Sequence, residues 1–361
     1  MKSTLRVQFW STPQGVDYLN IGLIFLSLFL AIRLPFELFL FSYAVLGPLH
    51  YLTEINWLRE RRFFSAGRYD WIWLSVLSFL IFMGFFSTEY LQASSDNPHG
   101  LWAKFPALKP LAAFLERNSA SFVFLAFGLA GVFTFLKKVL YRLAGAVIIL
   151  ALAMFFSRWT WYGIVFGMFI PTIIHVCIFT GLFMLYGALR HKSIPGLMSF
   201  FALLLAVIII LKMNASAYAG RVPSQSVINV YFSSKFQYLN LILFKLLAPA
   251  VKVKQYLETE IPWAFMNTVY GWRIQTLIAF SYTYHYLNWF SKTGIIKWHH
   301  TPKSFLALAG CIWLISLSLY AYDYHIGLVA LFFLSVLHVF LEFPLNFQSM
   351  AGIWRSLFLK G

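Results

Sequence analysis

Long apolar runs separated by short polar connections repeat along the whole chain. Each run approaches or exceeds the roughly 20 residues that an α-helix needs to cross a bilayer. We expect ten spans, at about 18–34, 35–57, 69–87, 119–136, 139–157, 162–189, 194–212, 264–290, 303–322 and 326–346. The runs are continuous and do not alternate between apolar and polar residues, which argues against a transmembrane β-barrel. The pattern therefore predicts an all-α fold, a polytopic transmembrane helix bundle forming a single integral-membrane domain over residues 1–361.

Three places complicate this pattern. The sequence IRLPF around Pro35 allows either a tight hairpin or one broken helix between the first two runs. The connection 88–118 contains SSDNPHG and several prolines, and 213–262 is a second long connection. We expect both connections outside the cytoplasm. The second one contains YLNLILFKLLAPAV, which is short for a span and favours a re-entrant or interfacial helix.

Basic residues mark every second boundary between the runs. Cytoplasmic connections of membrane proteins carry an excess of Lys and Arg, so this alternation fits ten spans with both termini in the cytoplasm. The basic groups are Lys2 and Arg6; Arg59, Arg61, Arg62 and Arg68; Lys137, Lys138 and Arg142; Arg190 and Lys192; Lys292, Lys297 and Lys303; and Arg355 and Lys360.

Composition supports a membrane protein and removes one alternative. Of the 361 residues, 60% are hydrophobic and only 11% are charged, against about 25% charged in soluble domains. The net charge of +16 lies in the connections, so we expect a lipid bilayer as partner and no nucleic acid. The first twenty residues lack the apolar core and cleavage site of a secretory signal. We expect a multi-pass protein of the inner (plasma) membrane.

Four histidines fall inside predicted spans: His50, His175, His285 and His338. Ionisable groups within a membrane are costly and rare, so a functional site is the default interpretation. Two of these histidines have a carboxylate four residues later, in HYLTE and HVFLE. Because residues at i and i+4 share a helix face, each of these two helices can present an imidazole and a carboxylate to the same point.

The histidines and the two carboxylates, Glu54 and Glu342, together form a candidate metal site. Imidazole and carboxylate ligands suit iron, manganese or zinc, and facing helices carrying His and Glu hold iron pairs in known bundles. We expect Fe(II), either mononuclear or in a two-metal centre, with zinc or haem as alternatives. The competing interpretation is structural: each His hydrogen-bonds a neighbouring helix, Glu54 pairs with nearby arginines, and Glu342 lies at the interface.

The stretch 281–303, SYTYHYLNWFSKTGIIKWHHTPK, carries further candidates. Tyr284 and Tyr286 flank His285 and are candidate catalytic residues, although an interfacial aromatic belt explains them equally well. His299 and His300 follow in a predicted cytoplasmic loop and are second-tier metal ligands. Pro48 lies just before His50 and Pro171 just before His175, where a proline frees a backbone carbonyl that could orient an imidazole.

Several catalytic motifs are absent from the sequence. It contains no HExxH, no Gly-rich phosphate loop, no dinucleotide fingerprint and no eight-histidine boxes of the desaturase kind. GPLHYLTE, with Pro48, His50 and Glu54, resembles the early motif of the Brp/Blh-type carotene dioxygenases of bacteria and archaea. His175, His285 and LHVFLE match the order of that family's later motifs. The chain departs from the family in the Leu49 insertion, in Glu54 for Asp, and in Trp289 where a second His is expected.

The resemblance implies a multi-span, iron-dependent enzyme that cleaves carotene to retinal. The residues and the resemblance together predict a membrane oxygenase or related oxidoreductase with non-haem iron, acting on a lipophilic small molecule such as a carotenoid, isoprenoid or lipid. Three alternatives remain open. They are a haem-binding electron carrier with bis-His sites, a proton-coupled transporter using buried His and Glu, and a structural subunit without chemistry.

Overall fold

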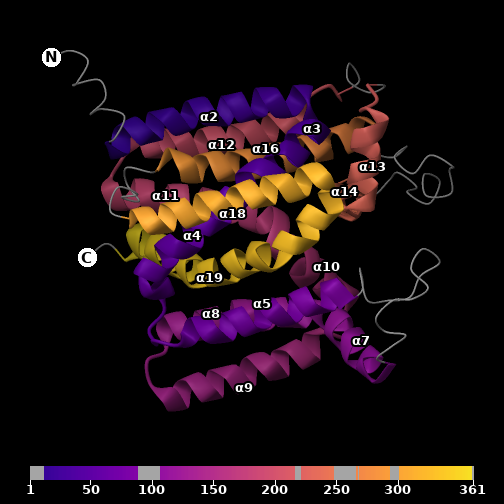
Figure 1. Ribbon diagram of the computed structural model, residues 1–361. Coiled ribbons are helices and arrows are strands. Elements are labelled where there is room, and N and C mark those ends of the chain that lie inside the picture. Colours follow the sequence, from indigo (N-terminus) through magenta and orange to yellow (C-terminus); the bar gives the residue numbers. More distant parts are fainter. Residues whose placement is uncertain are drawn as a thin grey trace. The chain divides into compact units, whose positions relative to one another are not determined.

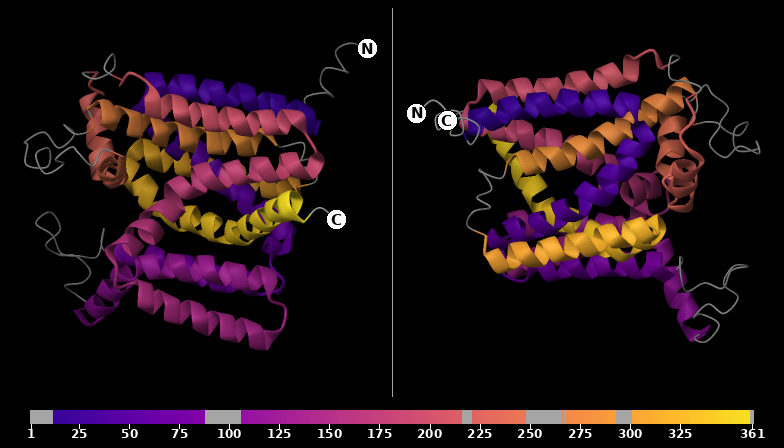
Figure 2. Two further views of the ribbon diagram at one scale, coloured as in Figure 1. Left: turned by 180° about the vertical axis from the view of Figure 1, so that it is seen from behind. Right: turned by 45° about the horizontal axis from the view of Figure 1, so that its top comes forward.

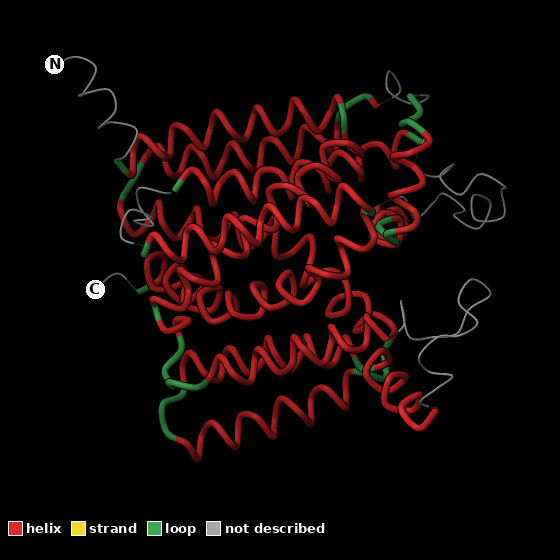
Figure 3. The backbone as a smooth tube through the Cα atoms, in the orientation of Figure 1, coloured by secondary structure: helices red, strands yellow, loops and turns green. Residues whose placement is uncertain are grey.

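The structure is a computed structural model that describes residues 12–87, 106–215, 221–247, 266, 268–292 and 301–359. Within these ranges every element is a helix or a connecting segment, and no strand occurs (Figure 3). This confirms the predicted all-α class. His299 and His300 lie outside the described residues.

The chain divides into two compact units. Unit 1 comprises Met1–His50, Val176–Leu328 and Gly352–Gly361, and unit 2 comprises Tyr51–His175 and Val329–Ala351. The divisions fall inside continuous helices. Each unit is described separately below.

Unit 1 is built around α16, the most thoroughly buried of its helices. α16 contacts α2, α3, α12 and α14, and Figure 1 shows α2, α12 and α16 running side by side. The helices of unit 1 are α2 (Pro13–Arg33), α3 (Pro35–Phe41), the π-helix η1 (Ser42–Leu46), α11 (Thr180–His191), α12 (Ile194–Lys212), α13 (Gln225–Ser233), α14 (Gln237–Leu247), α16 (Val269–Ser291) and α18 (Lys303–Tyr322).

Several polar side chains of α16 are hydrogen-bonded inside unit 1. The hydroxyl groups of Ser42 and Thr283 lie 2.7 Å apart. The Gln275 amide donates to the carbonyl of Pro35 at 2.9 Å, and the Asn240 amide donates to Gln275 Oε1 at 2.8 Å. Because buried polar groups are costly unless hydrogen-bonded, these contacts explain how so polar a helix can occupy the interior.

Unit 2 contains a layer formed by α5, α8 and α9, in which α8 contacts both of the others (Figure 2). Its helices are η2 (Arg62–Phe64), α5 (Asp70–Phe86), η4 (Pro106–Leu108), α7 (Lys109–Arg117), α8 (Ser119–Phe135), α9 (Val139–Phe156) and α10 (Thr160–Ile164). α7 and α8 meet at a bend of 56°. The Arg142 guanidinium forms a bidentate pair with the Asp70 carboxylate, at 2.9 and 3.0 Å, which joins α9 to α5.

Three helices contribute residues to both units. They are α4 (Gly47–Glu60), the π-helix η5 (Val165–Phe179) and α19 (Tyr324–Phe358). α19 has 35 residues and contains Pro344. These three helices carry five of the six predicted metal ligands.

A helix occupies the described part of each of the ten predicted runs. Among the described residues, seven helices are long and apolar enough to cross a membrane by themselves. α8 qualifies only jointly with α7, α5 is shorter at 17 residues, and α16 is not among the seven. The exact number of spans and the side on which the termini lie stay predictions.

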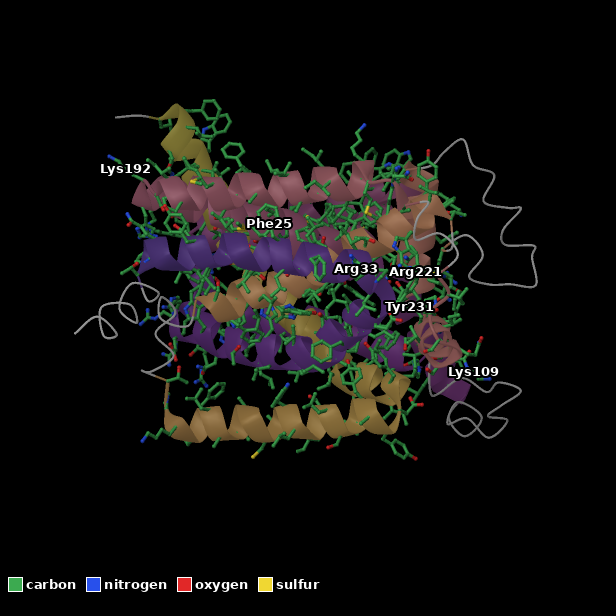
Figure 4. The ribbon with its side chains drawn as sticks, turned by 90° about the horizontal axis from the view of Figure 1, so that it is seen from above. Phe25, Arg33, Lys109, Lys192, Arg221 and Tyr231 are labelled. Carbon is green, nitrogen blue, oxygen red and sulfur yellow. The ribbon has the colours of Figure 1, made fainter. Side chains whose placement is uncertain are left out.

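The structure adds detail at two of the places where the sequence pattern was ambiguous, around Pro35 and in the connection 213–262. α2 ends at Arg33 and α3 begins at Pro35, with Leu34 between them in a non-helical conformation (φ −137°, ψ 57°). Figure 4 labels Phe25 and Arg33 on α2. The connection 213–262 contains two short helices, α13 and α14, and the YLNLILFKLL part of its apolar stretch lies in α14.

Candidate metal centre

His50 follows a π-helical turn in the chain. In η1 the Gly47 N–H donates to the carbonyl of Ser42, five residues earlier, and Pro48 comes next. Proline has no N–H and its ring clashes with the carbonyl four residues before it, so the widened turn accommodates Pro48. The Trp313 indole donates to the nearby Val45 carbonyl at 2.8 Å.

The imidazoles of His50 and His285 face each other within unit 1. Their Nε2 atoms lie 3.0 Å apart, and the rings are nearly perpendicular, with an interplanar angle of 74°. Both side chains are buried. Two ligand atoms at about 2.1 Å from one metal, separated by about 90° at that metal, would lie about 3.0 Å apart. The pair thus has the spacing of two adjacent ligands, which is also the spacing of an N–H···N hydrogen bond.

Thr180 determines which nitrogen of His285 carries the proton. The Thr180 hydroxyl donates its one hydrogen to the carbonyl of Val176 at 3.1 Å. Oγ1 also lies 2.7 Å from Nδ1 of His285, so it must accept a hydrogen bond from Nδ1–H. In the neutral imidazole this leaves the lone pair on Nε2, the atom that faces His50. A partner that fixes the tautomer in this way is typical of metal-binding histidines.

Aromatic rings surround the His50 imidazole. The ring centroids of Tyr286 and Trp289 lie 5.1 and 5.6 Å from that of His50. Tyr286, one of the predicted catalytic residues, is therefore adjacent to the histidine pair. Tyr284, the other, instead has its hydroxyl 3.3 Å from both Asn20 Oδ1 and Met184 Sδ. Successive residues of a helix are about 100° apart around its axis, which explains why the two tyrosines have different neighbours.

A second histidine pair lies in unit 2. Nδ1 of His175 is 3.5 Å from Oε2 of Glu342, and the rings of His175 and His338 have centroids 5.1 Å apart. The ring of Tyr51 stacks on His338 at 5.4 Å. All three ionisable side chains are buried, with 5% exposure or less. His338 and Glu342 of HVFLE therefore lie beside His175 in this unit.

Glu54, the remaining predicted ligand, is also buried in unit 2, with 3% exposure. Two of the nearby arginines have further contacts on the same helix and its end. Arg59 donates to Asn56 Oδ1 at 2.8 Å, and Arg61 lies 3.9 Å from Glu60. All six predicted ligands are therefore buried in the protein.

Two of these side chains form a pair that could hold a metal ion within unit 1. His50 and His285 each offer one nitrogen, Nε2, and the two nitrogens lie 3.0 Å apart. Two buried imidazoles suit iron, zinc or copper, and they leave coordination positions open for other ligands. Because the proton of His285 is on Nδ1, its Nε2 has a lone pair for a metal ion, which further supports a metal site here.

Thr180 is the residue that the sequence interpretation missed. It follows His175 by five residues within an apolar run and matches no motif, so only its contact with His285, 105 positions away, identifies it. Comparison of the chain with protein-family models, curated proteins and solved structures finds no match.

Proposed function

We propose that this protein is a membrane oxygenase that uses non-haem iron and acts on a lipophilic substrate. The observation that carries the proposal is the buried His50–His285 pair, whose Nε2 atoms lie 3.0 Å apart in an apolar helical protein. Buried carboxylates extend the donor set, and Glu342 lies beside His175. Fe(II) bound by imidazoles with open positions is the usual centre for dioxygen activation without haem.

The chain's own residues have separate roles in this proposal. His50 and His285 bind the metal through one nitrogen each, and His338 is a further candidate ligand. Thr180 holds His285 in the tautomer that presents Nε2. Glu54, Glu342 and His175 are further ligands or orient the ligands by hydrogen bonds. Tyr286 and Trp289 exclude water beside His50 and give a lipophilic molecule an apolar surface.

A bis-His haem is less compatible with the His50–His285 pair. Two imidazoles on opposite sides of a haem iron, each about 2.0 Å from it, hold their nitrogens about 4 Å apart. The observed 3.0 Å is too short for that arrangement. The separation fits adjacent positions on one metal, which the porphyrin does not offer to two axial ligands.

The resemblance to the Brp/Blh-type dioxygenases suggests the substrate class. We propose a carotenoid or another isoprenoid that enters from the bilayer. The short patches that carry the resemblance include His50, Glu54, His338 and Glu342, all of which are buried. A proton-coupled transporter would use the same side chains, so the test must measure metal and substrate turnover separately.

The test uses the full chain purified in detergent. Elemental analysis should find iron in the wild type and a loss of most of it in His50→Ala and His285→Ala. His191→Ala is the matched control, because His191 is an exposed histidine at the end of α11. Expression in carotenoid-producing cells should then deplete carotenoid and generate apocarbonyl products in the wild type only.

Two results would decide against the proposal. A wild-type protein without any bound transition metal would remove the metal centre. A protein that binds iron, consumes no dioxygen with any lipophilic substrate, and carries protons across vesicles would support the transporter instead.

A further inference from the structure

Two polar side chains near the end of α19 are buried without a partner. Neither the carbonyl oxygen nor the amide nitrogen of Asn346 has a hydrogen-bond partner in the described part of the chain, and the same is true of the Ser349 hydroxyl. Asn346 is 1% exposed and Ser349 is 0% exposed. Both belong to unit 2.

These side chains continue the polar face that carries the metal-site residues. At 100° per residue, His338, Glu342, Asn346 and Ser349 fall within about 80° of one another around the helix axis. The opposite face is apolar, because Phe343 and Phe347 pack on Phe127 of α8, with centroids 5.2 and 4.8 Å apart. Asn346 and Ser349 therefore point away from α8, on the side of Glu342.

Burying such groups without a protein or water partner would destabilise the folded protein. A buried polar group without a hydrogen bond costs about 1–3 kcal/mol, and Asn346 and Ser349 have three such atoms between them. Buried waters typically satisfy groups of this kind and need two to four polar partners. The amide donor, the amide acceptor and the hydroxyl supply those partners.

We propose that Asn346 and Ser349 bind a short chain of water molecules that leads along α19 to the Glu342 carboxylate. The axial distance from Glu342 to Ser349 is about 10 Å, and that from Glu342 to Asn346 about 6 Å. One water spans the gap of about 6 Å between Glu342 and Asn346, because two successive hydrogen bonds of about 2.8 Å cover nearly that length.

This inference rests on the proposed function for its purpose. The waters would bring hydrogen-bonding groups to the Glu342 carboxylate inside an otherwise apolar site, from the side of α19 that ends near Arg355.

Radiolytic hydroxyl-radical labelling in ¹⁸O-water tests the proposal without requiring activity. Bound water near a side chain produces local oxidation even in a membrane interior. We expect labelling of Leu345 in the wild type and a several-fold decrease in the Asn346→Leu/Ser349→Ala double variant. Ser78→Ala is the control, because the buried Ser78 hydroxyl donates to the Leu74 carbonyl and needs no water.

The single variant Ser349→Ala, a small truncation, covers the case in which the double variant fails to fold. It should also reduce the labelling. Equal labelling in the wild type and in a folded variant would overturn the proposal. A higher melting temperature for Asn346→Leu would also overturn the proposal, since it would mean that no water is hydrogen-bonded to the Asn346 amide in the wild type. Removing the metal with a chelator should leave the labelling unchanged, so failure of the metal proposal gives a different result.

Discussion

The Thr180 hydroxyl lies 2.7 Å from Nδ1 of His285 and connects α11 to α16. Because its hydrogen is used on the Val176 carbonyl, Thr180 acts on His285 only as an acceptor. The relationship separates the roles of the two imidazole nitrogens, and Nε2 is the one that faces His50.

The first prediction concerns Thr180. Thr180→Val keeps the shape of the side chain but removes the acceptor, so the tautomer of His285 is no longer fixed. Loss of such an orienting partner typically lowers metal affinity by about 10- to 100-fold. Competition with a chelator measures the affinity, and ¹⁵N chemical shifts of the imidazole report the tautomer. Thr180→Ser keeps the hydroxyl and should retain both properties, and an unchanged affinity in Thr180→Val would argue against this role.

A second prediction concerns the ion pair between Asp70 and Arg142. The Asp70 side chain is 7% exposed, and both of its oxygens accept from the guanidinium. Breaking a buried pair leaves an uncompensated charge, so Asp70→Asn should lower the free energy of unfolding by about 3 kcal/mol. Thermal unfolding in detergent provides the measurement. Glu60→Gln removes the more exposed pair with Arg61 and should cost less than about 1 kcal/mol.

The third prediction is a pH dependence that arises from Tyr231. Its hydroxyl lies 2.6 Å from both Asn240 Oδ1 and Gln275 Oε1. Tyr231 is labelled in Figure 4. Burial raises the pKa of the Tyr231 phenol well above its usual value, and the hydrogen bonds to Gln275 and Asn240 oppose this effect.

An unfolded tyrosine has a pKa of about 10. Above that pH the unfolded chain releases the proton first, so stability is full below about pH 10 and is lost as the pH rises through the folded-state pKa. Tyr231→Phe should flatten the decline of the melting temperature above pH 10. The same slope in both proteins would show that Tyr231 does not contribute.

A fourth prediction concerns the close approach of α18 and α19 in unit 1. A Cβ added at Gly327 would lie 2.9 Å from the Cα of Tyr320 and 2.6 Å from its ring. Gly327→Ala must therefore displace backbone, and it should lower the melting temperature by several degrees. Gly310→Ala is the matched control on α18, because a Cβ there meets nothing within 4 Å. It should be neutral or slightly stabilising, since alanine favours the helix by about 0.5–1 kcal/mol.

The sequence predicted the features that depend on helical periodicity and on the cost of burying charge. A helix occupies each predicted run, and the i, i+4 spacing identified the pairs His50–Glu54 and His338–Glu342, all of which are buried. The burial of His175 and His285 also followed from their positions in apolar runs.

Features that depend on contacts between distant residues could not be predicted. The choice of Thr180 as the partner of His285 requires knowing which helices are neighbours. The different surroundings of Tyr284 and Tyr286 depend on the orientation of α16, which a nearly uniformly buried helix does not reveal through its pattern of apolar residues. Asn346, in contrast, continues the i, i+4 series beyond Glu342 and was detectable from the sequence.

The π-helical turn η1 contains one residue more than a regular helix needs. Five residues, Ser42–Leu46, form a turn that an α-helix would close with one residue fewer. Deleting one residue there would restore regular winding and leave His50 at nearly the same angle around the helix axis, but it would set the ring of Pro48 against the carbonyl four residues before it. Relatives of this protein that lack the extra residue should therefore also lack the proline two positions before this histidine.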